Sequence, residues 1–203
     1  MSGIVGSLLN ARGSGVVAKL GTDGQIFTST GVGLKQGFET ITAGGISHAD
    51  FFRLTTAFTG DANPIASNWE RVDTSHFGLG DMTQAVSESS GIFTFAATGT
   101  YFIEAASTVG HETEDTRHAN LFIKTTSNNG SNWYDRTEAR CTTENGSGNW
   151  TLDSMQASCL FDVTDVAQCK ASLRTYKINT NLSTRGSSTL NITWIEFIRL
   201  AGT

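Results

Sequence analysis

The feature that most constrains the fold is a series of short apolar segments separated by turns, which fills residues 51–203. β-Branched and aromatic residues gather in these segments, and clusters of Gly, Asn, Ser and Asp lie between them, as at 127–131 and 144–148. Such alternation is typical of strands and turns, and no convincing helical periodicity competes with it. The pattern predicts an all-β fold, a jelly-roll β-sandwich of about eight to ten strands. The expected strands are Phe51–Phe58, Trp69–Thr74, Gly91–Phe95, Thr100–Thr108, Ala119–Thr126, Trp133–Thr142, Trp150–Val163, Lys170–Ile178 and Thr189–Leu200.

Composition narrows the classes of function. Charged residues make up 16% of the chain, against about 25% in an average soluble domain. The net charge of −5 argues against nucleic-acid binding, which needs clustered Lys and Arg. The sequence has no long apolar run, so we expect no membrane insertion. It also lacks the N-terminal pattern of a secretory signal, so we expect assembly in a cytoplasm.

Residues 1–50 have a different character from the rest of the chain. They are rich in glycine, and their apolar residues come in pairs such as Val16-Val17 and Ile26-Phe27. Such a segment cannot bury enough surface alone to offset its ordering entropy, and strands longer than about four residues are not expected. It is either disordered or an extended arm ordered by neighbouring molecules, and the regular apolar pairs favour the arm. The expected attachment residues are Val16, Val17, Leu20, Ile26 and Phe27.

Several predicted strands are apolar on both faces. Tyr101-Phe102-Ile103 is one example, and Trp194-Ile195 and Phe197-Ile198 flank Glu196 in another. An outer strand of a monomeric sandwich should alternate apolar and polar residues, so the second face of these strands needs a cover. A further copy of the chain is the favoured cover; a wider core or the N-terminal arm are the alternatives. Tyr101, Phe102, Trp194 and Phe197 are the expected core and intersubunit packing residues.

Three segments resemble a known group of jelly rolls. Gly91–Phe95 followed by Gly99–Ile103 resembles a Gly-x-Phe-x-Phe…Gly-x-Tyr hairpin, while Ser158–Val163 and Leu190–Leu200 resemble a late strand and a final strand. All three are similar to elements of the complement-type and tumour-necrosis-factor-like jelly rolls. The resemblance implies a homotrimer, a final strand buried at the trimer centre, and a role in binding rather than catalysis. Because a fold hosts many functions, this implication stays an analogy.

A second resemblance concerns the setting. The segment Leu20–Gly33 is similar to a short sequence that recurs in bacteriophage tail fibres and other virion appendages. We therefore expect a non-enzymatic virion structural protein, a capsid decoration (cement) or head-fibre protein whose partners are itself and capsid or other virion proteins. The alternative is a tail-fibre or receptor-binding protein that contacts glycans or proteins of a host surface. A secreted bacterial lectin-like module is a third class, which the missing signal disfavours.

The polar clusters predict no catalytic, cofactor or metal site. His111–His118 is the densest of them, but it lacks the HExxH spacing and is expected to be a solvated loop. A metal site or a pH-sensitive or receptor-contacting loop are the alternatives there. Asp162 and Asp165 flank an expected turn, where Asp is favoured for local hydrogen bonds.

Cysteines and surface aromatics leave two questions open. Cys141, Cys159 and Cys169 make an odd count without zinc-site spacing, which favours buried free thiols. A Cys141–Cys159 bridge is the alternative. Three aromatics beside Gly- and Asn-rich loops could either stack on sugars or pack ordinarily at strand ends: Trp133, Tyr134 and Trp150.

Overall fold

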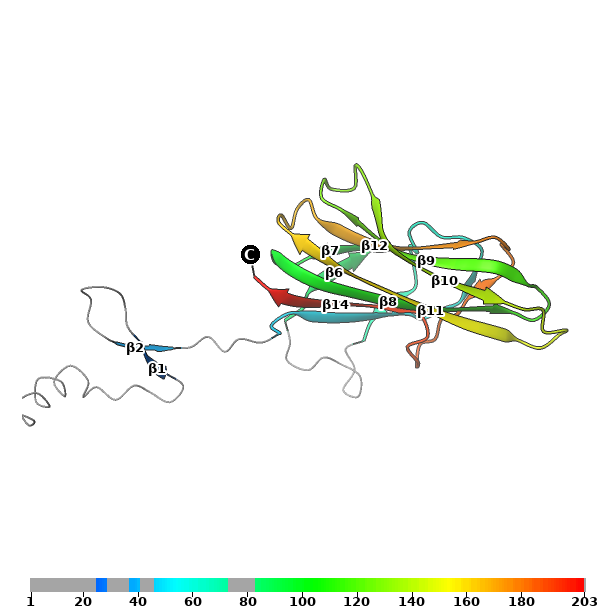
Figure 1. Ribbon diagram of the computed structural model, residues 1–203, viewed down its shortest axis with the longest axis horizontal. Helices are drawn as coiled ribbons and strands as arrows, with labels where there is room; N and C mark the ends of the chain where they lie inside the picture. Colours follow the sequence, from blue (N-terminus) through cyan, green and yellow to red (C-terminus); the bar gives the residue numbers. More distant parts are fainter. Residues whose placement is uncertain (1–24, 29–36, 41–45, 73–82, 203) are drawn as a thin grey trace, which may run out of the picture. The chain divides into compact units, whose positions relative to one another are not determined.

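The computed structural model describes residues 25–28, 37–40, 46–72 and 83–202, the first two stretches by their backbone alone (Figure 1). The chain divides into two units, Met1–Gly45 and Ile46–Thr203, and the second is called the head below. All regular structure in the described residues is β-strand. The described part accordingly contains no helix that could cross a bilayer.

The first unit contains one small antiparallel sheet. Strands β1 (Gln25–Thr28) and β2 (Gly37–Thr40) pair with Phe27 opposite Phe38. Each has four residues, within the limit of about four that the glycine-interrupted sequence sets. Ile26 and Phe27 therefore belong to β1, of which only the backbone is described, whereas Val16, Val17 and Leu20 lie outside the described residues.

The head is a jelly-roll sandwich of two antiparallel sheets (Figure 1). One sheet has the order β10-β9-β12-β7-β6, and the other has the order β4-β13-β8-β14-β3-β5 with β11 on the free edge of β8. Their bounds are β3 Ala49–Leu54, β4 Phe58–Thr59, β5 Trp69–Arg71, β6 Val86–Ser89, β7 Ile92–Phe95, β8 Gly99–His111, β9 Thr116–Thr126, β10 Tyr134–Thr143, β11 Thr151–Val163, β12 Lys170–Lys177, β13 Ser183–Thr184 and β14 Trp194–Ala201. The all-β jelly roll predicted from the sequence is confirmed.

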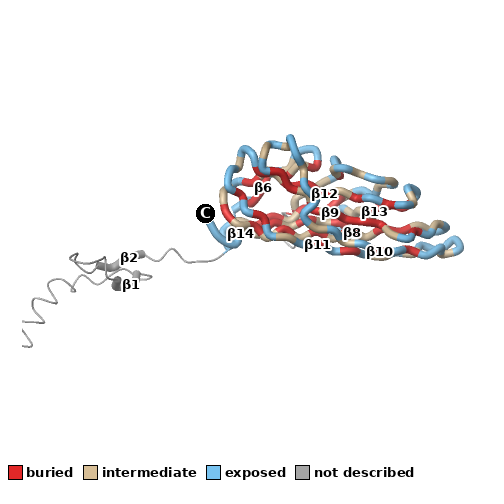
Figure 2. Tube along the Cα trace, turned by 45° about the horizontal axis from the view of Figure 1, so that its top comes forward, coloured by how far each residue is buried: buried red, intermediate tan, exposed pale blue. Residues whose placement is uncertain are grey.

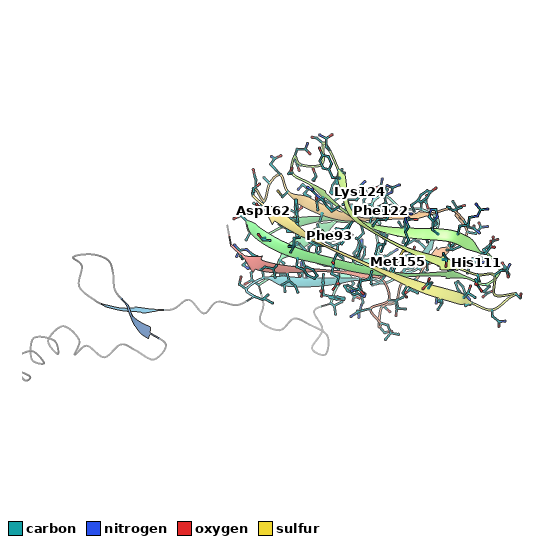
Figure 3. All side chains as sticks on the ribbon, in the orientation of Figure 1. Phe93, His111, Phe122, Lys124, Met155 and Asp162 are labelled. Atoms are coloured by element: carbon teal, nitrogen blue, oxygen red, sulfur yellow. The ribbon has the colours of Figure 1, made fainter. Side chains whose placement is uncertain are left out.

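Aromatic side chains join the two sheets. Phe93 of β7 is fully buried, and its ring lies 5.2 Å from that of Phe52 and 5.0 Å from that of Phe197 (centroid distances). Phe93 comes from one sheet and its two partners from the other, so this cluster forms the centre of the core (Figure 3). Buried positions follow the strands, and exposed positions gather at the loops (Figure 2).

The expected hairpin between Gly91–Phe95 and Gly99–Ile103 is wrong. β7 pairs with β6 and β12, whereas β8 belongs to the other sheet, so the intervening residues cross from sheet to sheet. Phe95 packs onto Tyr101 with ring centroids 4.7 Å apart, and the Tyr101 hydroxyl donates to the Ala97 carbonyl at 2.9 Å. Both aromatics face inward because the core lies between the two strands rather than on one side of a hairpin.

Some strand boundaries also differ from those predicted. The expected strand Phe51–Phe58 ends at Leu54, because the Leu54 carbonyl accepts from Ser187 N and Thr55 N donates to Asn68 O, which directs the backbone into loops. β14 begins at Trp194 rather than at Thr189. Strand β6 was not predicted, since Val86-Ser-Glu-Ser offers only one apolar residue as a signal.

An ion pair between Arg71 and the buried Asp50 connects the two sheets. Asp50 of β3 lies 2.9 Å from Arg71 Nε of β5 and accepts a hydrogen bond of 2.8 Å from the backbone N–H of Val86 in β6. Arg71 also donates to the Val86 carbonyl at 2.6 Å and lies over the Phe52 ring. Burial raises the pKa of Asp50 despite these partners. Loss of the Arg71 charge would leave the buried Asp50 carboxylate unpaired, which is strongly destabilising.

Candidate functional site

One side of the β11-β8-β14-β3 sheet forms the principal candidate site. Along β8 and the first half of β14, buried and part-buried positions alternate, so every second side chain points away from the core. In β3, Phe51 is part-buried between buried neighbours, and Arg53, which shares its side of the strand, is itself buried. We call this surface the outer face. Cross-strand partners lie on the same side of a sheet, and the pairs Trp194–Arg53 and Phe102–Ile198 define this side. The side chains of the outer face are those of Phe51, Arg53, Phe102, Glu104, Leu160, Trp194, Glu196 and Ile198.

The outer face is apolar in two areas. Phe51 and Trp194 stack with ring centroids 5.0 Å apart and planes at 28°. Toward the β11 edge of the same face, Phe102 lies between its cross-strand partners Ile198 and Leu160. Leu160 is 63% exposed and the others are part-buried. Covering these side chains would be favourable, because removing apolar surface from water contributes about 25 cal/mol per Å².

Two carboxylates lie between the apolar areas. Glu104 of β8 and Glu196 of β14 are direct partners in the antiparallel register. Burial raises the pKa of Glu196, and the charge of Glu104 and a hydrogen bond with it raise that pKa further. Arg53, a base on the same face, is bonded to Glu70 at 2.8 Å. The pair is therefore an acidic strip inside an apolar surface.

The four predicted packing residues divide between the core and the outer face. Tyr101 and Phe197 are fully buried between the sheets. Phe102 and Trp194 are part-buried on the outer face. The sequence identified the four as a group, whereas their assignment to faces depends on the strand register, which a one-residue shift would invert. Sequence reasoning missed Phe51 as the stacking partner of Trp194 because the two are far apart in the chain.

A second cluster lies at the apex, the end of the head opposite the C-terminus. β8 runs from Thr100, paired near the C-terminus with Ala201, to His111, paired with Thr151. Near this end the Arg185 guanidinium lies 4.6 Å from the centroid of the Trp150 ring, and the rings of His111 and Trp150 are 6.2 Å apart. Trp150 is 45% exposed and Leu152 is 55% exposed, so the apex presents apolar surface as well as charge.

The segment His111–His118 runs from the end of β8 into β9, and hydrogen bonds within it and from the loop after β12 hold it. His111 Nδ1 accepts from Thr113 N at 3.1 Å, and Glu114 accepts from the side chains of Asn179 and Asn181. These amides lower the pKa of Glu114. His118 lies apart on β9, with its ring 6.3 Å from that of Tyr176. In the part of the chain that the structure describes, no group of three His, Cys, Asp or Glu residues is placed to hold a metal ion.

The remaining polar and sulfur candidates have structural surroundings. The Asp165 side chain accepts from Ala167 N at 2.8 Å, so the expected Asp turn is present. All three cysteines are free thiols. Cys141 lies 3.9 Å from the Met155 sulfur, and burial raises the pKa of its thiol to about 12. The Cys141–Cys159 bridge left open by the sequence is not formed, and Cys159 is only part-buried.

The fold of the head is similar to that of known proteins. No family model and no curated protein matches the sequence. The Eiger TNF of S. frugiperda aligns with a TM-score of 0.57 at 10% identity, over 78% of this chain and 96% of that one. Murine APRIL at pH 8.5 aligns with a TM-score of 0.52 at 10% identity, over 75% of this chain and 98% of that one. The head therefore has a tumour-necrosis-factor-like jelly-roll fold.

Proposed function

We propose that the chain is a non-enzymatic protein that assembles into homotrimers through its outer face. One observation supports this most directly: Phe51, Phe102, Trp194 and Ile198 are only part-buried on that face, and Leu160 is largely exposed. A symmetric association would remove this apolar surface from water. The trimer is the symmetry that the resemblance to tumour-necrosis-factor-like jelly rolls implies.

The trimer serves, in this proposal, as a structural component of a virion, either a capsid decoration (cement) protein or a head fibre. The similarity of Leu20–Gly33 to segments of phage appendages supports this setting. The geometry of the head is compatible with attachment at one end. The head begins beside the C-terminal strand, with Ala49 paired to Ile198, and its apex loops lie at the opposite end. In this proposal, residues 1–45 attach the head to the virion, and the apex faces away from the particle.

Electron microscopy of virus particles that contain the chain tests this role. Particles are labelled with an antibody against the head, and we expect label over the capsid shell. A variant lacking residues 1–45 should leave the head folded, as judged by its thermal unfolding, and absent from the particle. Particles without label, or decoration that survives the deletion, would contradict the proposal.

The apex favours a second candidate role, that of a tail-fibre or receptor-binding protein. Trp150 and Leu152 expose apolar surface there beside the Arg185 guanidinium, and exposed aromatics paired with Arg are typical of binding hot spots. In that case the antibody should label the tail, and the protein should bind host cells. Trp150→Ala should then weaken binding at least tenfold, while Tyr134→Ala, an exposed aromatic on β10, should not.

A further inference from the structure

A small hollow lies on the surface of the other sheet, away from the outer face. It has a volume of about 170 Å³, well below the ~300–1,000 Å³ of sites for drug-sized ligands. It lies where β7 and the Asn63-Pro64 segment meet β12, with β9 beside them. A hollow of this size can take one ring-sized unit of a larger ligand. Its lining residues are Asn63, Pro64, Ile92, Lys124, Trp133 and Ser172.

The aromatic wall of the hollow is held in place by a tightly bonded loop. Trp133 follows the turn at 127–132, in which the Thr126 hydroxyl accepts from Gly130 N at 3.1 Å and the Asn128 side chain accepts from Asn132 N at 2.9 Å. Gly130 has φ +86°, and a side chain there would contact the Trp133 indole. The indole therefore lies against Gly130 of this hydrogen-bonded turn, and a pre-ordered aromatic surface reduces the entropic cost of binding.

The hollow also contains a positive charge. Lys124 Nζ donates to the Asn63 side-chain oxygen at 2.9 Å. Asp135, the partner of Lys124 on β10, is bonded to Arg174. Among the described residues, no carboxylate forms an ion pair with Lys124. In a chain of net charge −5, an ammonium paired only with a neutral amide favours an anionic ligand.

We propose that this hollow binds one acidic pyranose unit of a glycan, a sugar ring that carries a carboxylate. The apolar C–H face of the ring packs against Trp133, as aromatic walls favour. The carboxylate binds Lys124 through a charge-assisted hydrogen bond. Asn63 and Ser172 supply the amide and hydroxyl groups that hydrogen-bond sugar hydroxyls.

The position of the hollow makes it independent of trimer formation. Lys124 and Ser172 belong to the β10-β9-β12-β7-β6 sheet, whereas the outer face belongs to the β11-β8-β14-β3 sheet. The site is complete within one chain, so its failure and the failure of the proposed assembly can be told apart.

Ligand-observed NMR and calorimetric titration of the full chain test the site. The probes are methyl β-glucuronide, methyl α-N-acetylneuraminate and the neutral methyl β-glucoside. At least one acidic glycoside should bind at least tenfold more tightly than the glucoside. Preference for the glucuronide would identify a uronic acid as the ligand, and preference for the neuraminate would identify a sialic acid. Lys124→Gln should remove that preference, and Trp133→Ala should abolish binding of all three.

Tyr134→Ala is the matched control, because Tyr134 adjoins Trp133 in sequence but does not line the hollow. It should bind as the wild type does, and all variants should keep the wild-type melting temperature within a few degrees. The proposal is overturned if the wild type binds no acidic glycoside, if it prefers the neutral one, if Lys124→Gln keeps the preference for the acidic one, or if binding persists in Trp133→Ala.

Discussion

Glu104 and Glu196 lie directly opposite each other on the adjacent strands β8 and β14, in the middle of the outer face. Like charges in direct opposition destabilise a strand pair, and this pair lies between Phe102 and Trp194. A proton on Glu196 removes the repulsion and allows a hydrogen bond with Glu104.

Protonation of Glu196 should therefore contribute stability to the folded head in acid. Burial and Glu104 raise the pKa of Glu196 above its ordinary value of 4.5, so the folded state binds more protons than the unfolded state in the window just above that value. The contribution is complete below pH 4.5 and is lost as the pH rises through the raised pKa. Glu196→Gln should remove this part of the pH dependence and raise the melting temperature at pH 7.

Melting curves of the wild type and of Glu196→Gln between pH 4.5 and pH 7.5 check this prediction. Glu112→Gln is the control, since Glu112 is exposed in the apex loop and should keep the wild-type profile. Parallel curves for the wild type and Glu196→Gln would show that the pair does not titrate in this range.

Lys177 should make the head more stable as the pH rises in the alkaline range, opposite to the effect of Glu196. Its side chain is 1% exposed, donates to the Gly60 carbonyl at 2.6 Å and lies over the Phe58 ring. Burial lowers its pKa from 10.5 to about 8, so between these values the unfolded state binds more protons. The free energy of unfolding should then rise with pH across this window, by up to about 3 kcal/mol at about 1.4 kcal/mol per pKa unit.

Chemical denaturation of the wild type and of Lys177→Met at pH 7.5 and pH 10 measures that contribution. The wild type should gain more stability, or lose less, than Lys177→Met over the interval. An identical change in both proteins would mean that Lys177 keeps an ordinary pKa in the fold.

Gly91 should be among the least replaceable glycines of the head. It has φ +77° in the turn between β6 and β7, and a Cβ atom there would collide with the Ile65 backbone. Gly91→Ala should cost well over 1 kcal/mol and lower the melting temperature by at least ~2–4 °C. Gly148 has φ +94° with nothing near its Cβ position, so Gly148→Ala should cost less. Equal losses would leave the Ile65 contact without a role.

Much of the head could be predicted from the sequence because its strands are long and its turns are marked. Ala119–Thr126 and Trp150–Val163 were placed within a few residues, since apolar runs and Gly/Asn clusters bound them. The sheet to which Gly91–Phe95 belongs could not be predicted. A short aromatic strand has the same sequence pattern whether it pairs with the next strand in a hairpin or crosses to the other sheet. The fold confirms the jelly roll, while the phage setting stays a prediction.

The candidate sites show where local sequence stops being informative. Phe102 and Trp194 were identified by their apolar strands, yet the Glu104–Glu196 contact depends on a register between distant segments. The sequence predicts no hollow and marks Trp133 only as one of three aromatics beside Gly- and Asn-rich loops. Its chemistry depends on Lys124 and Asn63, which the topology brings together from separate parts of the chain.

The association of the chain through its outer face is tested most directly by light scattering coupled to size-exclusion chromatography. The full chain at micromolar concentration should have the mass of a trimer. Leu160→Glu, a change at a side chain that is 63% exposed and therefore tolerated by the fold, should give a monomer. Ile178→Glu, at a 48% exposed position directly after β12 of the other sheet, should leave the trimer intact. A monomeric wild type, or a trimer that survives Leu160→Glu, would contradict the account.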